Sequence, residues 1–377
     1  MPRQLNEQNP MIAQPTTRWT LLRTITGIAG FALGLWLLVN LIRSNDFSNA
    51  PAILWNIGFW SILFILIPYS LASMLDAEAW RRMLSTGARI PFRKIFRIRT
   101  GSEALVITVP LGSILSDPFK GWMLKREFAL PYSTTAASIV FRKALLGLSQ
   151  GLIAVFIALV ALCLPSQFES AALGKTVVWS LFFIGVGIAV VYGLLIALIS
   201  YGSFVDRLHG WLARLPLKRI AVWFERKEPQ FRECNAHLAS FRGWRPIFSA
   251  IATYVLLWSI EDLETIVIVL ILGANLTIPQ TLVMEAACVL VRTAAPMVPG
   301  GIGIQDTGYV SMLVANGNSP SLAAAFLVLK RFRELVWAGL GYFLIAVSKQ
   351  KKRSAEFDRE EELAHTENST VPVTENL

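Results

Sequence analysis

The residues best suited to bind a polar group lie between Ala294 and Arg333, in an otherwise very apolar chain. This stretch combines prolines and glycines with Asp306 and Arg331. Irregular backbone at membrane depth persists only where protein or a water-filled cavity covers it. Charged side chains at that depth mark functional sites. The sequence PGGIG at 299–303 therefore predicts the tip of a broken, re-entrant helix beside a polar cavity.

An earlier segment of the chain resembles this stretch. A shift of 189 residues aligns Pro110 with Pro299, and 8 of the 33 positions from Pro110 to Arg142 are identical. The matches that carry structural meaning are Pro110 with Pro299, Gly112 with Gly301, Asp117 with Asp306, Pro131 with Pro320, and Arg142 with Arg331. Chance similarity between two apolar segments is the alternative. We prefer an internal repeat, which is common in transporter folds.

The repeat singles out paired residues for ligand binding. Arg142 and Arg331 suit a phosphate, because guanidinium binds it through two parallel hydrogen bonds. The broken helices add N-termini, which favour an anion. Asp117 and Asp306 either hold these arginines or meet a cationic headgroup. The alternative for every such residue is an ion pair that only fixes helix packing.

A further pair has opposite charge at equivalent positions. Glu103 aligns with Arg292, so we expect these side chains to pair across the pseudo-two-fold axis. The candidate substrate-binding residues are Arg142, Arg331, Asp117, Asp306, Pro110, Gly112, Pro299, Gly300, Gly301, Glu103 and Arg292. The two glycines at 300 and 301 are expected to adopt positive φ or to allow a close backbone approach.

Composition identifies the class of protein. Of 377 residues, 54% are hydrophobic, and the mean hydropathy is +0.53. Runs of about 20 apolar residues predict transmembrane helices. The net charge of +10 does not indicate nucleic-acid binding, because the basic residues cluster beside apolar spans. The three scattered cysteines predict neither disulfides nor a metal site, and no cofactor is expected.

The elements that position these residues form an all-α membrane protein with about six full spans and two re-entrant hairpins. We expect a disordered N-terminus over 1–17 and one transmembrane domain over 18–350. Within that domain, repeat 1 covers about 53–164 and repeat 2 about 247–348. A connecting span and a basic loop occupy 165–246, and residues 354–377 are expected to be disordered.

Charge predicts the orientation. Segments rich in Lys and Arg, at 76–100, 202–246 and 349–353, are expected in the cytoplasm together with both termini. Segments 43–52, 165–175 and 273–279 are then outside, and the two repeats have opposite orientation. In such inverted repeats the substrate site lies near the midplane, at the broken helices. The loop 202–246 either lies on anionic lipid headgroups or binds a partner protein.

The turn also resembles a known family. Its residues Pro299, Gly300, Gly301, Gly303, Gln305 and Asp306 are similar to a turn in the flippase-like transmembrane domain of lysylphosphatidylglycerol synthases. Pro110, Gly112 and Asp117 resemble that family's weaker mid-chain version. The resemblance covers about residues 15–350. With Gly308 and Tyr309 following, the turn is most similar to hopanoid-biosynthesis-associated members. Thr307 and Asp306 depart from the commoner Gly and Glu.

The resemblance implies a multi-pass protein of the bacterial inner membrane that moves a phospholipid or a hopanoid-type lipid across the bilayer. Aminoacyl-transferase activity is not implied, because the soluble domain of the synthases is not recognised in this sequence. One alternative is a non-transporting scaffold that docks lipid-biosynthesis enzymes through 202–246. Another is a headgroup transferase. The sequence contains no HExxH or DDxxD motif and no Ser/His constellation, so we expect no enzyme activity.

Overall fold

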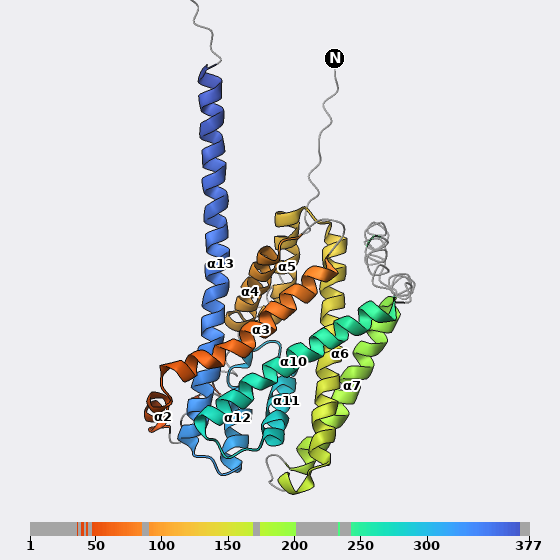
Figure 1. Cartoon of the computed structure of the whole chain (residues 1–377), viewed down its shortest axis with the longest axis vertical. Coiled ribbons are helices and arrows are strands. Elements are labelled where there is room, and N and C mark those ends of the chain that lie inside the picture. The colour runs from red at the N-terminus through yellow and green to blue at the C-terminus, as the bar shows by residue number, and fades with distance from the viewer. Residues whose placement is uncertain are drawn as a thin grey trace, which may run out of the picture.

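The described part of the chain is helical. The computed structural model describes residues 47–84, 90–168, 174–200 and 243–369, with isolated positions at 36, 39, 40, 43 and 233. Every regular element in these residues is a helix (Figure 1), which confirms the all-α class. In order they are α2 (Ala50–Ile57), α3 (Phe59–Met83), α4 (Phe92–Thr108), α5 (Gly112–Phe128), α6 (Tyr132–Leu162), η1 (Pro165–Gln167), α7 (Lys175–Ser200), α10 (Trp244–Leu272), α11 (Ile278–Ala294), η2 (Pro299–Gly301), α12 (Ile304–Ala315) and α13 (Pro320–Ser369).

Three of the described helices are long and apolar enough to cross a membrane, namely Phe59–Met83, Tyr132–Leu162 and Lys175–Ile199. The helices α10 and α13 are also long, but each carries several charged residues part way along its length. Residues 1–46, apart from positions 36, 39, 40 and 43, and most of the basic loop at 202–246 lie outside the described residues. The number of about six spans therefore stays a prediction.

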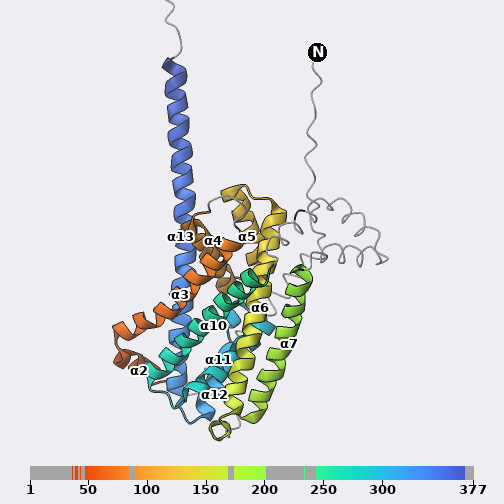
Figure 2. The same ribbon diagram turned by 45° about the vertical axis from the view of Figure 1, so that its right-hand side comes forward.

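Two sets of four helices follow one another in the same order, with a long helix, two shorter helices and another long helix. The first set is α3 to α6, and the second is α10 to α13. The shift of 189 residues lays each helix of the first set over its counterpart in the second. The helix α3 packs along α10 in both views (Figures 1 and 2), while α4 packs along α13 and α11 along α6.

Three connections gather at one end of the bundle. Thr277 of the α10–α11 loop donates from Oγ1 to Oε1 of Gln167, which follows α6, at 2.7 Å. The backbone N–H of Asn275 donates to Oδ1 of Asn318, between α12 and α13, at 2.7 Å. The segment before α2 joins this end, since the Asn49 N–H donates to Ser321 Oγ at 3.3 Å.

Apolar packing lies on both sides of a polar layer. One cluster of buried residues includes Ile65 of α3 and the 154–161 portion of α6, together with side chains of α7 and α10 to α13. Another joins Trp80 of α3 to Ile139 of α6, with α4 and α5. Along both α3 and α6, the charged residues described below lie between these two clusters.

The first hairpin turns as its proline predicts. Pro110 lies between α4 and α5, and the next residue, Leu111, has φ 60°. Gly112 begins α5 so close to α4 that a Cβ there would lie 2.0 Å from the carbonyl oxygen of Leu105. Only a residue without a side chain allows the two helices to approach in this way.

The second hairpin turns through η2, which begins at Pro299. Gly300 and Gly301 have φ 59° and 66°, as expected from the sequence. This turn contacts the first one. Ser113 of α5 donates from Oγ to the carbonyl of Pro296 at 3.1 Å. The tips of the two hairpins therefore contact each other.

The C-terminal helix is longer than the sequence analysis expects. Disorder is predicted from residue 354, but α13 continues to Ser369 and extends beyond the other helices in Figure 1. Residues 354–369 contain five Glu, a residue type with high helix propensity, which favours continuation of the helix. The predicted disordered segments 1–17 and 370–377 lie outside the described residues.

The close approach at Gly112 can be tested directly. We expect Gly112→Ala to lower the free energy of unfolding by about 1–3 kcal/mol, the usual effect of overpacking. The matched control is Gly121→Ala in the same helix, where a Cβ meets nothing within 4 Å. Thermal unfolding in detergent micelles measures both. Equal stability of the two variants would contradict the close contact between α4 and α5.

Candidate functional site

A cavity of about 230 Å³ lies in the polar layer, lined by residues of both helix sets. Residues of α3, α4, α6, α10, α11, α12 and α13 reach it. Its cationic side chains are Arg99, Arg142, Arg292, Lys330, Arg331 and Arg333. Its carboxylates are Asp76, Glu103, Glu261, Glu264, Glu285, Asp306 and Glu334. The two signs nearly balance, so the cavity is polar without a large net charge.

On the side of the first helix set, one carboxylate holds two arginines. Arg142 donates from Nε to Oδ1 of Asp76, and Arg99 donates from Nε to Oδ2, each at 2.9 Å. Arg99 also donates to Ser73 Oγ at 2.9 Å. Asp76 is only 2% exposed, so its charge is compensated almost entirely by these two guanidinium groups. The shared carboxylate ties α4 and α6 to α3.

The alternative in which Asp117 holds Arg142 is wrong, because Arg142 pairs with Asp76. The aspartate that aligns with Asp306 is Asp117, and it lies away from the cavity, paired with Lys120 at 3.1 Å and with Lys143. The reason is a difference in helix start. The helix α12 begins three residues later than the repeat predicts, so Asp306 is its third residue, whereas Asp117 is the sixth residue of α5. The two aspartates therefore point in different directions.

On the side of the second helix set, Asp306 and Arg331 form the pair that the repeat predicts as one alternative. The carboxylate accepts from Arg331 Nε at 3.1 Å and from the Gly303 backbone N–H at 2.9 Å. Arg331 also donates to the carbonyl of Gly300 at 3.0 Å and to Glu334. One guanidinium thus holds the PGG turn, the start of α12 and α13 together.

This arrangement changes the role predicted for the helix N-terminus. The carboxylate of Asp306 already binds the first N–H of α12, which satisfies part of the anion preference of that terminus. An incoming anion would have to displace a side chain that is also paired with Arg331. The N-terminus of α12 is therefore already capped by Asp306, and an anion could bind there only by displacing this side chain.

A third group of contacts connects α10, α11, α12 and α13. Lys330 donates from Nζ to Thr265 Oγ1 at 2.6 Å and to Glu285 at 3.3 Å. Glu285 accepts from the Tyr309 hydroxyl at 2.7 Å. Arg333 lies 3.2 Å from Glu264 and completes the set. These residues are buried, and they fix the second helix set around the cavity as Asp76 fixes the first.

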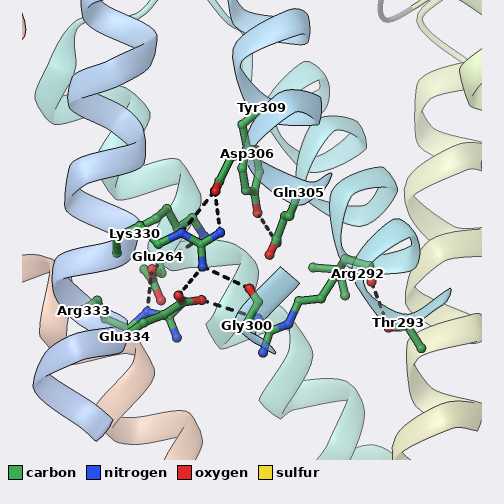
Figure 3. A network of polar contacts seen from close by, with 12 residues as sticks. Glu264, Arg292, Thr293, Gly300, Gln305, Asp306, Tyr309, Lys330, Arg333 and Glu334 are labelled. Atoms are coloured by element: carbon green, nitrogen blue, oxygen red, sulfur yellow. Dashed lines mark hydrogen bonds and ion pairs between the residues drawn. The ribbon is translucent and has the colours of Figure 1, made fainter. Parts of the chain in front are cut away.

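The predicted pairing of Glu103 with Arg292 is wrong, although both residues line the cavity. The ion-pair partner of Arg292 is Glu334, with Nη1 and Oε1 3.7 Å apart. Arg292 sits beside the PGG turn (Figure 3), and its side chain is 29% exposed. It is therefore the most accessible cation of the cavity and the one with the loosest ion pair.

Sequence reasoning missed Asp76 and Arg99, and it named neither Lys330 nor Glu285 as a site residue. The charge pattern predicts Asp76 at the start of the cytoplasmic segment 76–100, whereas α3 continues past it to Met83. A signal was available for Arg99, which lies four residues before Glu103 and thus on the same face of α4.

The family comparison covers this whole site. A family described as the lysylphosphatidylglycerol synthase TM region matches residues 27–341, an interval that includes every cavity-lining residue. The chain belongs to this family. A comparison with curated proteins gives no match. Membership of the lysylphosphatidylglycerol synthase TM family, together with the apolar helices, makes this a membrane protein.

In this member of the lysylphosphatidylglycerol synthase TM family, the free energy of unfolding distinguishes the roles of Asp76 and Asp117. We expect Asp76→Asn to lower the free energy of unfolding by about 3–5 kcal/mol, because it leaves two buried guanidinium groups uncompensated. The matched change Asp117→Asn removes a carboxylate whose side chain is 21% exposed, so it should lower the free energy of unfolding by less than Asp76→Asn does. Denaturant unfolding in micelles compares them. A larger loss for Asp117→Asn would reverse the assignment.

The triple role of Arg331 gives a second prediction. We expect Arg331→Gln to lower the free energy of unfolding by about 3–5 kcal/mol, because Asp306 and Glu334 lose their common partner. Arg331→Lys should also be impaired, since lysine lacks the planar fork that reaches three acceptors. The exposed control Arg82→Gln should stay within about 0.5 kcal/mol of wild type.

The double variant Arg331→Gln with Asp306→Asn separates the two acceptors. It should recover only part of the loss in unfolding free energy, because Glu334 remains uncompensated. Full recovery would show that Asp306 is the only partner that matters for Arg331.

Proposed function

We propose that the protein moves a lipid across the bacterial inner membrane, with the headgroup passing through the charged cavity. The observation that carries the proposal is a buried polar cavity lined from both helix sets, with the tips of both hairpins meeting close to it. Buried charges of this number are costly in an apolar protein and are typical of a substrate pathway. The family supports a role in lipid metabolism.

An inverted-topology repeat is part of this proposal. Support comes from the packing of helices of one set against helices of the other set. The helix α4 lies along α13, and α11 lies along α6. The three loops predicted to lie outside are hydrogen-bonded at one end of the bundle. The proposed orientation has both termini in the cytoplasm. Cysteines introduced at Ser170 and Arg226, in a background without the native cysteines, should be labelled from outside and inside respectively. Labelling from the same side would refute this topology.

The proposed substrate is a phospholipid or a hopanoid-type lipid. Arg292 is the most suitable first contact for a phosphate, because its side chain is the most exposed of the cavity cations and its 3.7 Å ion pair is long. Guanidinium can exchange a carboxylate for a phosphate without losing its hydrogen bonds. The hopanoid alternative rests on the turn, where Gly308 and Tyr309 follow the Ile-Gln-acidic sequence.

A lipid-translocation assay tests the proposal. Wild-type protein in vesicles should expose an inner-leaflet fluorescent phospholipid to an external quencher faster than empty vesicles do. We expect Gly301→Leu to return the rate to that of empty vesicles, because leucine is strained at φ 66° and its Cβ would lie 3.1 Å from Arg292 Cγ.

Gly187→Leu is the matched control for this assay. Gly187 lies on an exposed face of α7, and a Cβ there meets nothing within 4 Å. Wild-type vesicles that expose lipid no faster than empty ones would contradict transport and favour a scaffold or a headgroup transferase. A Gly301→Leu protein that translocates normally would show that the turn is not tightly packed.

A further inference from the structure

A second hollow of the structure lies on its outer surface, between the neighbouring helices α5 and α6. Its volume is about 580 Å³, which exceeds that of the charged cavity and falls within the range of ligand sites. Its walls are residues within 117–122 of α5 and within 132–143 of α6. The lining positions of α6 recur every three or four residues, so one face of that helix forms a wall. We call this hollow the α5–α6 groove.

Most of the groove is apolar and open to its surroundings. Trp122 of α5 and Val140 of α6 are exposed, and so is Ala136 of α6. The helix α6 is among the described helices that are long and apolar enough to cross a membrane. An exposed apolar surface on such a helix is suited to lipid acyl chains.

The end of the groove near the α5–α6 turn has the features of a membrane interface. Trp122 and Tyr132 lie there, and these two residue types are enriched at headgroup level. Lys125 Nζ lies 4.3 Å from the centroid of the Tyr132 ring, and Arg126 Cζ lies 5.3 Å from that of the Trp122 ring. The helix α6 has 31 residues and is about 46 Å long, whereas the hydrocarbon core is about 30 Å thick. Part of α6 must therefore extend to the headgroups, and the aromatic residues indicate its first turns.

Further along α6, the groove holds a carboxylate between two lysines. Asp117 pairs with Lys120 at 3.1 Å and with Lys143. The side chain of Lys120 is 8% exposed, whereas that of Lys143 is 49% exposed. If Lys143 turns to another anion, Asp117 keeps its buried partner. Lys143 is therefore the cation that a ligand in the groove can reach.

Cations outnumber carboxylates along the groove. Three exposed cations line or border it, namely Lys125, Arg126 and Lys143. Asp117 is the one carboxylate among the described lining residues. Two other carboxylates in neighbouring segments are already engaged, since Glu127 pairs with Arg97 at 2.9 Å and Glu233 accepts from Ser133 at 2.6 Å. The groove is thus complementary to a negatively charged group.

We propose that the α5–α6 groove binds a phospholipid with an anionic headgroup. Its acyl chain lies along the wall formed by Ala136 and Val140, and its phosphate meets Lys143. An ammonium group forms a charge-assisted hydrogen bond with phosphate, while Lys125 and Arg126 add attraction at the rim. A zwitterionic headgroup carries a cation of its own, so it gains less from these three side chains.

The groove is distinct from the charged cavity. Arg142 lines the cavity, whereas Lys143, the next residue of the chain, lines the groove on another face of α6. This inference concerns binding alone and does not depend on lipid movement. Its failure would leave the proposed function untouched, and a failure of transport would leave the groove untouched.

Site-resolved photo-crosslinking tests the groove. Wild-type protein in detergent micelles is incubated with phosphatidylglycerol that carries a diazirine on its acyl chain, and labelled residues are identified by mass spectrometry. We expect labelling of Ala136 and Val140. Unlabelled phosphatidylglycerol should compete for this labelling at a lower concentration than phosphatidylcholine does.

Two charge variants should change this competition in opposite directions. Lys143→Gln should weaken phosphatidylglycerol binding at the groove about fivefold, equivalent to about 1 kcal/mol for one basic residue near a membrane surface. Asp117→Asn should strengthen it, because Asp117 competes with the phosphate for Lys143. A purely structural role for this ion pair would predict that both changes weaken binding. The control Lys175→Gln should bind as wild type, because Lys175 is exposed at the start of α7, outside the groove.

A third variant, Ala136→Trp, fills the groove without changing its charge. It should abolish labelling of Val140. The matched control Gly187→Trp should retain this labelling, because Gly187 lies on an exposed face of α7, where a Cβ meets nothing within 4 Å.

Three results would overturn the proposed lipid site. The first is equal competition by the two lipids, or unchanged binding in both Lys143→Gln and Asp117→Asn. The second is an absence of labelling within 132–143 of the wild type. The third is a crosslink from a photoreactive residue at position 136 to the predicted span at 19–42, because another part of the chain would then cover the groove.

Discussion

Compensation of buried charge is the constraint on which this structure depends. A protein with this hydropathy can place thirteen charged side chains around one cavity only if nearly all of them are paired. Asp76 meets this condition for the first helix set by accepting from Arg99 and Arg142. Arg331 meets it for the second by joining Asp306, Glu334 and the Gly300 carbonyl. Each arrangement spans several helices, so the pairs define the packing and the cavity together.

Much of this organisation follows from the sequence. The prolines and glycines of the two turns predict where each hairpin bends, since only a few residue types accept positive φ or so close an approach. The 189-residue shift predicts the order of the helices. It also identifies Asp306 as one partner of Arg331, because that pair lies within a single repeat unit.

The rest depends on three-dimensional detail that an alignment of two segments does not carry. Arg142 pairs with Asp76, which lies on a helix before the aligned segment and beyond the predicted end of its span. Asp117 leaves the cavity because α5 and α12 start at different points of the repeat. Arg292 pairs with Glu334 instead of Glu103 because α13 brings a carboxylate closer. Small differences in where a helix starts therefore change which residues form ion pairs, while the order of the helices stays the same in both sets.

The balance of charge also bears on the proposed mechanism. A cavity with many free cations would hold an anionic headgroup tightly and release it slowly, which is unfavourable for transport. Here the cations are already paired, so in the proposed mechanism a headgroup would exchange one partner for another. Arg292 is the natural place for that exchange, because it combines exposure with a long ion pair beside the PGG turn. Binding would then be reversible from either side.

Photo-crosslinking with a phospholipid that carries a reactive group on its headgroup tests the use of this cavity most directly. In membranes containing the protein, we expect crosslinked peptides from the cavity face of α11 and from the turn at 299–303. Gly301→Leu should abolish this labelling, while Gly187→Leu should keep it. Labelling confined to the outer surface between α5 and α6, where Trp122 and Tyr132 line a separate pocket, would contradict passage of the headgroup through the charged cavity.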